Sequence, residues 1–170
     1  MTVDVRDVRL AAFDPSRHQA ILAEWLGRPH VARWWGDPAH ALAAVQQHPT
    51  DMEALIAIGA RPVGFVCWQT LAREELAAAG LDDLPSDLVD VDILIGEPDV
   101  LGRGVGPAAL SQLLEKLRAD GVRIVGLAAA VANVRALKAY DKAGFRAFRD
   151  FHEAGQDVRY LVQNLNAAAV

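Results

Sequence analysis

The sequence has very little of several features that would point to common classes of function. It contains one cysteine, Cys67, so no disulfide can form within the chain. Its 17 Lys and Arg residues are outnumbered by 22 Asp and Glu residues, which gives a net charge of −5. Binding to nucleic acid or to an anionic membrane surface needs a basic surplus instead. The five histidines show no paired spacing of the kind found at metal sites. We therefore expect no nucleic acid, no membrane and no metal as a partner.

Long apolar runs are missing too. The longest stretch of apolar residues and glycine, 124–132, is far shorter than the roughly 20 residues that a membrane-spanning helix needs. Residues 1–10 carry acids and arginines where a signal peptide would have an apolar core. With a single cysteine, this favours a cytoplasmic protein. The 170 residues, 52% hydrophobic and 23% charged, suit one globular domain spanning 1–170.

The spacing of apolar residues predicts an α/β fold. Helical periodicity is clearest where Leu110, Leu113, Leu114 and Leu117 recur along one face. Strands are predicted at 5–12, 52–58, 63–70, 89–95, 122–131, 145–151 and 158–165. About four principal helices are predicted at 15–27, 38–47, 104–119 and 133–143, and a short helical stretch is indicated at 71–79. The second half of the chain then mixes strands and helices in one layered domain.

Three glycines at alternate positions stand directly before the longest predicted helix. They are Gly102, Gly104 and Gly106. Such a loop exposes backbone N–H groups at a helix N-terminus, where the helix dipole favours an anion such as a pyrophosphate. A tight strand-to-helix turn without a ligand is the alternative. No Gly-Lys-Ser/Thr follows, so this is not a nucleotide-triphosphate loop, and no acid ends the next strand to hold the ribose of a dinucleotide.

Two carboxylates of the strand 89–95, Asp90 and Asp92, alternate with apolar residues and so share one face. A carboxylate so placed can act as a general base toward an ammonium group, and Asp92 is the candidate base. Asp90 would anchor a second ammonium group of the substrate, or raise the pKa of Asp92 by like-charge repulsion. Two solvated acids on an edge strand remain the alternative.

Two blocks of sequence are similar to the signature segments of the GCN5-related N-acetyltransferases (GNAT). The first runs through Val-Asp-Ile-Leu-Ile-Gly-Glu-Pro at 91–98 into the glycine loop at 101–106. The second, at 133–145, has Asn133, Tyr140 and Gly-Phe at the family's spacing. The resemblance covers about 3–165. It implies a central mixed, mostly antiparallel sheet of about seven strands, splayed between strands 4 and 5 to admit acetyl-CoA.

The resemblance also assigns roles to residues. Acetyl-CoA would contact the following residues: Ile93, Leu94, Ile95, Leu101, Gly102, Arg103, Gly104, Val105, Gly106, Asn133 and Tyr140. The family often has Gln or Arg where Leu101 stands, which removes a side-chain contact but leaves the backbone N–H groups. Tyr140 matches the family's general acid, which protonates the departing thiolate; a core aromatic is the alternative. Asn133 would cap its helix and also contact acetyl-CoA.

The closest likeness within the family is to aminoglycoside 6′-N-acetyltransferases. Asp92 matches the acid that these enzymes carry before their Gly-Glu-Pro-like segment. Trp34 and Trp35 resemble the aromatic segment after their first helix, where one ring would line the acceptor site and the other would join the core. One departure stands out, because many of these enzymes have an Asp-Pro where this chain has Ala128 and Ala129.

A local acidic segment supports a cationic substrate. Seven carboxylates and no Lys or Arg lie between 74 and 92: Glu74, Glu75, Asp82, Asp83, Asp87, Asp90 and Asp92. Asp82 and Asp83 would form an acidic rim that steers a polycation to the site; an ordinary solvated face is the alternative.

The sequence therefore predicts an acetyl-CoA-dependent N-acetyltransferase that acts on a primary amine of a cationic small molecule, with the 6′-amino group of an aminoglycoside as the favoured acceptor. It would work as a monomer or homodimer. Acylation of a siderophore precursor or of a protein N-terminal amine is the alternative reaction, and a CoA-binding module without turnover is the alternative outside enzymes.

Overall fold

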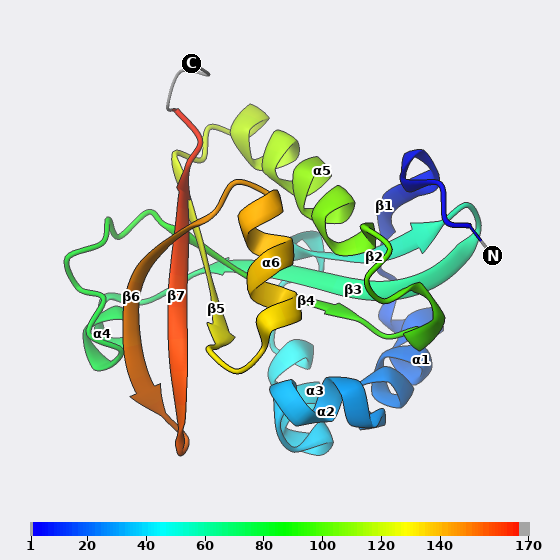
Figure 1. The fold of residues 1–170 in the computed structure, drawn as a ribbon, viewed down its shortest axis with the longest axis horizontal. Helices are drawn as coiled ribbons and strands as arrows, with labels where there is room; N and C mark the ends of the chain where they lie inside the picture. Colours follow the sequence, from blue (N-terminus) through cyan, green and yellow to red (C-terminus); the bar gives the residue numbers. More distant parts are fainter. Residues whose placement is uncertain (1, 167–170) are drawn as a thin grey trace. The chain divides into compact units, whose positions relative to one another are not determined.

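The computed structural model describes residues 2–166, and Figure 1 shows the course of the chain. The strands form one sheet in the order β1-β2-β3-β4-β5-β7-β6. The strands are β1 (Val8–Ala12), β2 (Glu53–Ile58), β3 (Arg61–Thr70), β4 (Val89–Ile95), β5 (Ile124–Ala130), β6 (Arg146–Glu153) and β7 (Gln156–Asn164). The α-helices are α1 (Pro15–Gly27), α2 (Pro29–Trp35), α3 (Pro38–Gln46), α4 (Arg73–Ala78), α5 (Val105–Ala119) and α6 (Val134–Lys142). Short 3-10 helices are η1 (Val5–Asp7), η2 (Thr50–Met52) and η3 (Pro98–Val100).

The predicted fold class is confirmed, with a mixed and mainly antiparallel sheet of seven strands. The described residues divide into two compact units. One comprises the described part of Met1–Cys67 together with Ile93–Gln112, and the other comprises Trp68–Asp92 together with the described part of Leu113–Val170. That 1–170 form one domain stays a prediction.

Three helices of the first unit, α1, α2 and α3, each begin with a proline at the first helical position, where its missing N–H costs nothing. Aspartates cap two of them. Asp14 accepts a hydrogen bond from the N–H of Ser16 before α1, and Asp37 accepts one from the N–H of His40 before α3. The buried face of α1, with Trp25 and Leu26, packs into the core of this unit.

Helix α2 was not expected, because the seven residues that form it hold too few turns for a periodic pattern to show. Gly36 ends it with a φ of +81°, a left-handed conformation that favours glycine. Residues 2–166 thus have six α-helices. These are the four principal helices that were expected, the short one expected near 71–79, and α2.

The first strand was expected to begin at Val5, but β1 begins at Val8. Residues Val5–Asp7 form η1, since Asp4 accepts a hydrogen bond from the N–H of Arg6 and turns the chain there. Strand β1 then pairs with β2 from Val8 onward. Its other edge is bound by Gln112 of α5, whose side-chain amide accepts from the N–H of Leu10 at 3.1 Å and donates to the carbonyl of Val8 at 2.6 Å.

In the second unit, β5, β7 and β6 form an antiparallel ladder, seen side by side in Figure 1. Strands β4 and β5 run parallel, and their pairing is limited to Val89 with Val125 and Asp90 with Gly126. Because β4 and β5 pair over two residues only, they separate along the rest of their length, as the family resemblance implied for strands 4 and 5. A core of buried leucines lies beside the ring of Tyr160: Leu76, Leu81, Leu84 and Leu88.

Candidate active site

The glycine loop forms a turn that leads directly into α5. Gly102 and Gly104 have φ values of +72° and +83°, so both occupy the left-handed region in which a side chain is strained. An added Cβ at Gly104 would also lie 3.1 Å from Val5. The two glycines are therefore required by the backbone itself, whatever the loop binds.

The start of α5 offers backbone donors of the kind expected. Its hydrogen-bond ladder begins where Ala108 N–H donates to the carbonyl of Gly104, so the N–H groups of Val105 and Gly106 precede the ladder. An added Cβ at Gly106 would meet no atom within 4 Å, which leaves this glycine open to a close approach from outside. Leu101 is half-buried and Arg103 is exposed.

The end of β4 lies in the first unit, where Ile93 and Ile95 are half-buried and Leu94 belongs to the core. The carbonyl of Ile95 is 3.1 Å from Nε2 of His30 on α2. The strand is closely packed here, since an added Cβ at Gly64 would lie 2.4 Å from the carbonyl oxygen of Leu94. The packing fixes the path of the backbone that is expected to carry acetyl-CoA.

Glu97, which follows β4, joins three side chains from other parts of the chain, and sequence reasoning did not identify it. Its carboxylate accepts a hydrogen bond from Trp25 at 2.8 Å and pairs with Arg28 at 3.0 Å and Arg61 at 3.3 Å. Burial acts to raise the pKa of Glu97, but the hydrogen bonds from Trp25 and Arg28 outweigh it and hold that pKa below its usual range. Beside it, the ring of Trp25 covers Gly96, where a Cβ would lie 2.1 Å from the ring. The Gly-Glu dipeptide thus ties α1 to the end of β4.

Asp90 and Asp92 share a face of β4, as predicted from their spacing. Asp90 is half-buried, whereas Asp92 is exposed. Burial and the nearby charge of Asp92 raise the pKa of Asp90 to about 7, even though a hydrogen bond from Tyr160 acts to lower it. A raised pKa is thus found at Asp90, and the effect that sequence reasoning considered for Asp92 stays a prediction.

Tyr160 of β7 is the partner that the sequence did not reveal. Its hydroxyl donates to Oδ1 of Asp90 at 2.8 Å. The ring reaches β4 by lying across β5 at Gly126, where an added Cβ would come within 2.3 Å of the hydroxyl oxygen. Ala128 is the direct partner of Tyr160 in the β5–β7 ladder, so it lies on the same face. The position that lacks the expected carboxylate is thus beside the Tyr160–Asp90 pair.

Tyr140 lies on α6 and is 8% exposed, with its ring edge-on to Phe145 at 6.3 Å. Burial, and secondly the charge of Asp92, raise the pKa of Tyr140 well above its ordinary value. The protonated form of the phenol is therefore favoured at neutral pH, and the charge of Asp92 acts on its hydroxyl. Asn133 caps α6 by accepting from the N–H of Ala136 at 3.2 Å, as expected.

The two tryptophans of α2 have different surroundings. Trp35 packs against the core cluster of the first unit. Trp34 is half-buried, and the guanidinium of Arg33 lies 4.7 Å from the centre of its ring. This matches the expected division into one core ring and one ring available to a ligand, but the ligand contact itself stays a prediction.

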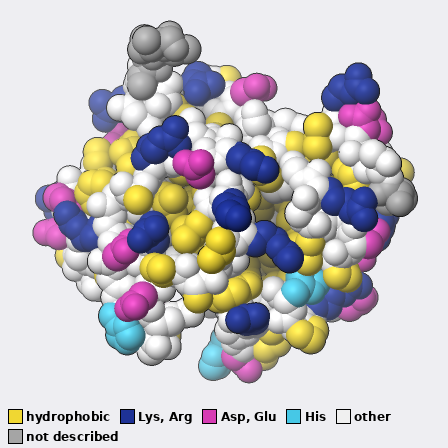
Figure 2. All heavy atoms as spheres, in the orientation of Figure 1, with side chains coloured by type: hydrophobic (Ala, Val, Ile, Leu, Met, Phe, Trp, Pro, Cys, Tyr) yellow, Lys and Arg dark blue, Asp and Glu magenta, His cyan; other side chains and the backbone are white. Residues whose placement is uncertain are grey.

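The acidic segment is partly neutralised by arginines from distant parts of the sequence. Asp83 forms a two-pronged ion pair with Arg149 at 2.8 Å, and Asp87 pairs with Arg123 at 2.6 Å. Asp82 is exposed. Figure 2 likewise shows acidic and basic side chains next to one another on the face drawn. The rim is therefore less negative than the sequence indicated, with Asp82 contributing more than Asp83.

Residues 2–166 contain neither a candidate metal centre nor a candidate membrane-spanning helix. No group of three or more His, Cys, Asp or Glu side chains is placed to hold a metal ion in that part of the chain. None of the helices described is both long enough and apolar enough to cross a membrane.

The sequence and the fold have known counterparts. The aminoglycoside N(6')-acetyltransferase type 1 of Klebsiella pneumoniae is 27% identical in an alignment 164 positions long, which covers 87% of this chain and 79% of that protein. Mycothiol acetyltransferase of Propionibacterium freudenreichii is 30% identical over 138 residues, which are 81% of this chain and 38% of that protein. The solved structure of AAC(6')-Ib in complex with ribostamycin and coenzyme A shares the fold, with a TM-score of 0.73, 22% identity and 93% of each chain covered.

The family comparison covers most of the chain. The acetyltransferase (GNAT) domain family matches residues 14–152, a range that contains β4, the glycine loop, Asn133 and Tyr140. The chain therefore belongs to the GNAT acetyltransferase family.

Proposed function

We propose that this protein transfers the acetyl group of acetyl-CoA to a primary amine of a cationic small molecule, and that the 6′-amino group of an aminoglycoside is the preferred acceptor. One observation carries the proposal: an exposed carboxylate, Asp92, lies close enough to the buried hydroxyl of Tyr140 for its charge to raise the pKa of that phenol. A base accessible to substrate and a protonated acid are the two groups that acetyl transfer needs.

The two groups divide the proton transfers. Asp92 accepts a proton from the substrate ammonium, which leaves an electron pair on nitrogen. As the bond between this nitrogen and the acetyl carbon forms, the bond between carbon and sulfur breaks, and the sulfur leaves with the bonding electrons. Tyr140 donates its hydroxyl proton to that sulfur, and the nitrogen releases its second proton to solvent as the amide forms. Tyr140 then regains a proton from solvent, and Asp92 releases to solvent the proton that it accepted. Asp90, held by Tyr160, keeps a second carboxyl group beside Asp92 for a further ammonium group of the substrate.

Acetyl-CoA fits the loop before α5. The pyrophosphate is held by the N–H groups at 102–106, which combine two left-handed glycines, the early N–H groups of a helix and the open approach at Gly106. Asn133, Ile93, Leu94 and Ile95 complete the proposed contacts. Arg103 adds a positive charge within the loop.

The aminoglycoside acceptor is supported by relatives and by charge. The Klebsiella pneumoniae relative is named for acetylation at the 6′ position, and the AAC(6')-Ib structure contains ribostamycin. Aminoglycosides are polycations, and Asp90, Asp92 and Asp82 offer carboxylates to several of their ammonium groups. Trp34 would contribute a ring face to the same ligand.

Ala128 favours a second candidate function. Because it lacks the carboxylate found in many aminoglycoside enzymes, acetylation of another amine, such as a siderophore precursor or a protein N-terminus, is the alternative. The relative named mycothiol acetyltransferase supports this alternative, because its name gives an acceptor other than an aminoglycoside. We also propose a cytoplasmic location, and a monomer or homodimer as the working form.

The test is a panel of amines with acetyl-CoA, followed by thiol release and by mass spectrometry of the product. We expect kanamycin to be acetylated and a matched aminoglycoside with a 6′-hydroxyl in place of the 6′-amino group to be a poor acceptor. Equal rates with the two would contradict the 6′ assignment. Thiol release that no amine stimulates would contradict the enzyme assignment and favour a binding module.

A further inference from the structure

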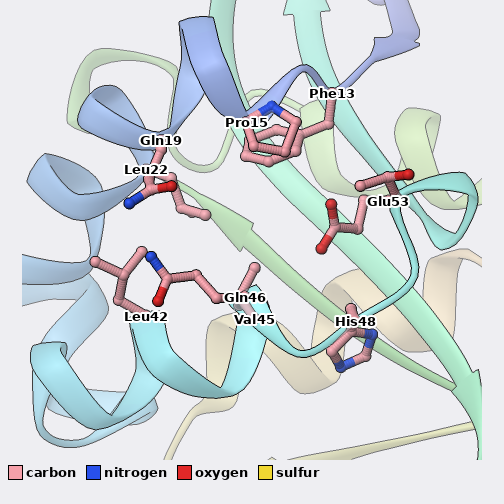
Figure 3. Close-up of a pocket in the computed structure, with 10 residues that line it drawn as sticks. Phe13, Pro15, Gln19, Leu22, Leu42, Val45, Gln46, His48 and Glu53 are labelled. Carbon is pink, nitrogen blue, oxygen red and sulfur yellow. The ribbon is translucent and has the colours of Figure 1, made fainter.

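The first unit contains a cavity of about 280 Å³ that none of the proposed catalytic residues lines. It lies between α1, α3 and the start of β2, as Figure 3 shows. Its walls include four apolar side chains, those of Phe13, Leu22, Leu42 and Val45. A cavity of this size is close to the lower end of the range of roughly 300 to 1,000 Å³ that is usual for small-molecule sites.

Glu53 brings a carboxyl group into this cavity. Within residues 2–166 it is the one charged residue that is buried, at 7% exposure, and Figure 3 shows its carboxyl group turned into the cavity. Among residues 2–166 this carboxyl group has neither a hydrogen bond nor an ion pair, and burial raises the pKa of Glu53. A buried carboxylate without a counter-charge is energetically unfavourable.

His48 supplies a second polar atom without a partner. Its Nδ1 is buried and makes no hydrogen bond within the part of the chain that the structure describes. In the tautomer that carries its proton on Nε2, this nitrogen is an acceptor. The cavity therefore presents one anionic group, the Glu53 carboxyl, because Nδ1 of His48 has no exposed surface that a ligand could reach. The other polar lining residues are Gln19, Gln46 and Thr50. Buried polar groups are normally hydrogen-bonded, so an unpartnered carboxyl that faces a cavity calls for a donor from outside the chain.

We propose that this cavity is a binding site for a primary alkylammonium group, whose N–H donors engage Glu53 while its carbon chain contacts Phe13, Leu22 and Val45. An ammonium group carries three donors and one positive charge, and so bonds to the carboxylate and neutralises it. The apolar part of the wall favours a hydrocarbon chain, since burial of CH₂ groups is favourable.

The experiment titrates the full chain with n-pentylammonium chloride in the absence of acetyl-CoA, by calorimetry and by amide chemical shifts. The comparison ligand is 1-pentanol, which has the same carbon chain and no charge. We expect the amine to bind at least 10-fold more tightly than the alcohol, with the largest shifts at residues 42–53. Equal affinity of the two ligands would overturn the proposal, and this comparison needs no variant.

Glu53→Gln keeps the size of the side chain and removes its charge, and we expect it to weaken the binding of the amine at least 10-fold. Asp51→Asn is the matched control, since it removes one negative charge two residues away at an exposed position. Unchanged affinity in Glu53→Gln, or an equal loss in Asp51→Asn, would overturn the proposal. Because no acetyl transfer is measured, either result leaves the proposed enzymatic function untouched.

Discussion

The hydroxyl of Tyr160 on β7 donates a hydrogen bond to Asp90 on β4 across a strand that lies between them. The 2.8 Å bond is possible because β5 has Gly126 at the point where the ring crosses. Asp90 is thereby held beside Asp92, with a pKa of about 7. Several expected outcomes depend on this arrangement.

Removal of the hydroxyl in Tyr160→Phe should raise the pKa of Asp90 further, because the hydrogen bond from Tyr160 acts to lower it. If Asp90 must be ionised to hold a substrate ammonium, the acid limb of the pH profile of kcat/KM should move to higher pH. The measurement is kcat/KM from pH 5.5 to 9 for both proteins. Gly126→Ala should move the limb in the same direction, since its Cβ displaces the ring. If the acid limb of the kcat/KM profile is unchanged in both variants, the ionisation of Asp90 plays no part in the reaction.

The same carboxyl group should make stability depend on pH. A carboxyl whose pKa is higher in the folded than in the unfolded chain destabilises the fold as pH rises, here between the ordinary value of 3.8 and about 7. Asp90→Asn should therefore gain free energy of unfolding relative to the parent on going from pH 4 to pH 8, on the order of 4 kcal/mol. Urea denaturation at the two pH values measures it. A difference between variant and parent that does not change with pH would contradict the assignment.

Much of this arrangement could not be read from the sequence. The alternation of Asp90 and Asp92 placed both on one face correctly, because strand periodicity is local. Tyr160 is 70 residues from Asp90 along the chain, and nothing near either residue indicates the bond. Arg149 and Arg123 likewise reach the acidic segment only through tertiary structure. The glycine loop and the cap at Asn133 were predictable, since turns and caps depend on neighbouring residues.

Gly104→Val should weaken the binding of CoA by blocking the loop before α5. The backbone there has a φ of +83°, and a β-branched residue is strained in this region. Gly121→Val is a matched control, because Gly121 has a φ of +85° and no atom within 4 Å of an added Cβ. Both variants should lose roughly 1 to 2 kcal/mol of stability. Calorimetry with CoA should show weaker binding only in Gly104→Val, and equal CoA affinities for the two variants would remove the loop assignment.

Tyr140→Phe should lower kcat roughly 10²-fold, the usual scale for a lost general acid, while CoA still binds. The buried ring remains in place beside Phe145, and only the hydroxyl is removed. Thiol release under saturating substrates measures the effect, and thermal unfolding controls for the fold. A variant that turns over at the parent rate would make Tyr140 a core residue and assign protonation of the sulfur to another group.

Asp92→Asn and Asp82→Asn should separate catalysis from attraction of the substrate. Both carboxylates are exposed, so each substitution removes one surface charge. Loss of Asp82 should raise KM without changing kcat, because it weakens binding equally in the ground and transition states. That rise should fade at high salt, since exposed charges are screened beyond about 8 to 10 Å near physiological ionic strength. Asp83→Asn should have a smaller effect on KM, because Arg149 already neutralises Asp83.

The most direct test of the account is the kcat of Asp92→Asn with kanamycin and saturating acetyl-CoA at pH 7. If Asp92 removes the proton from the substrate amine, kcat should fall by about 10²-fold or more while the affinity for CoA is unchanged. A kcat equal to that of the parent, at any KM, would contradict the proposal that Asp92 is the base of an acetyl transfer.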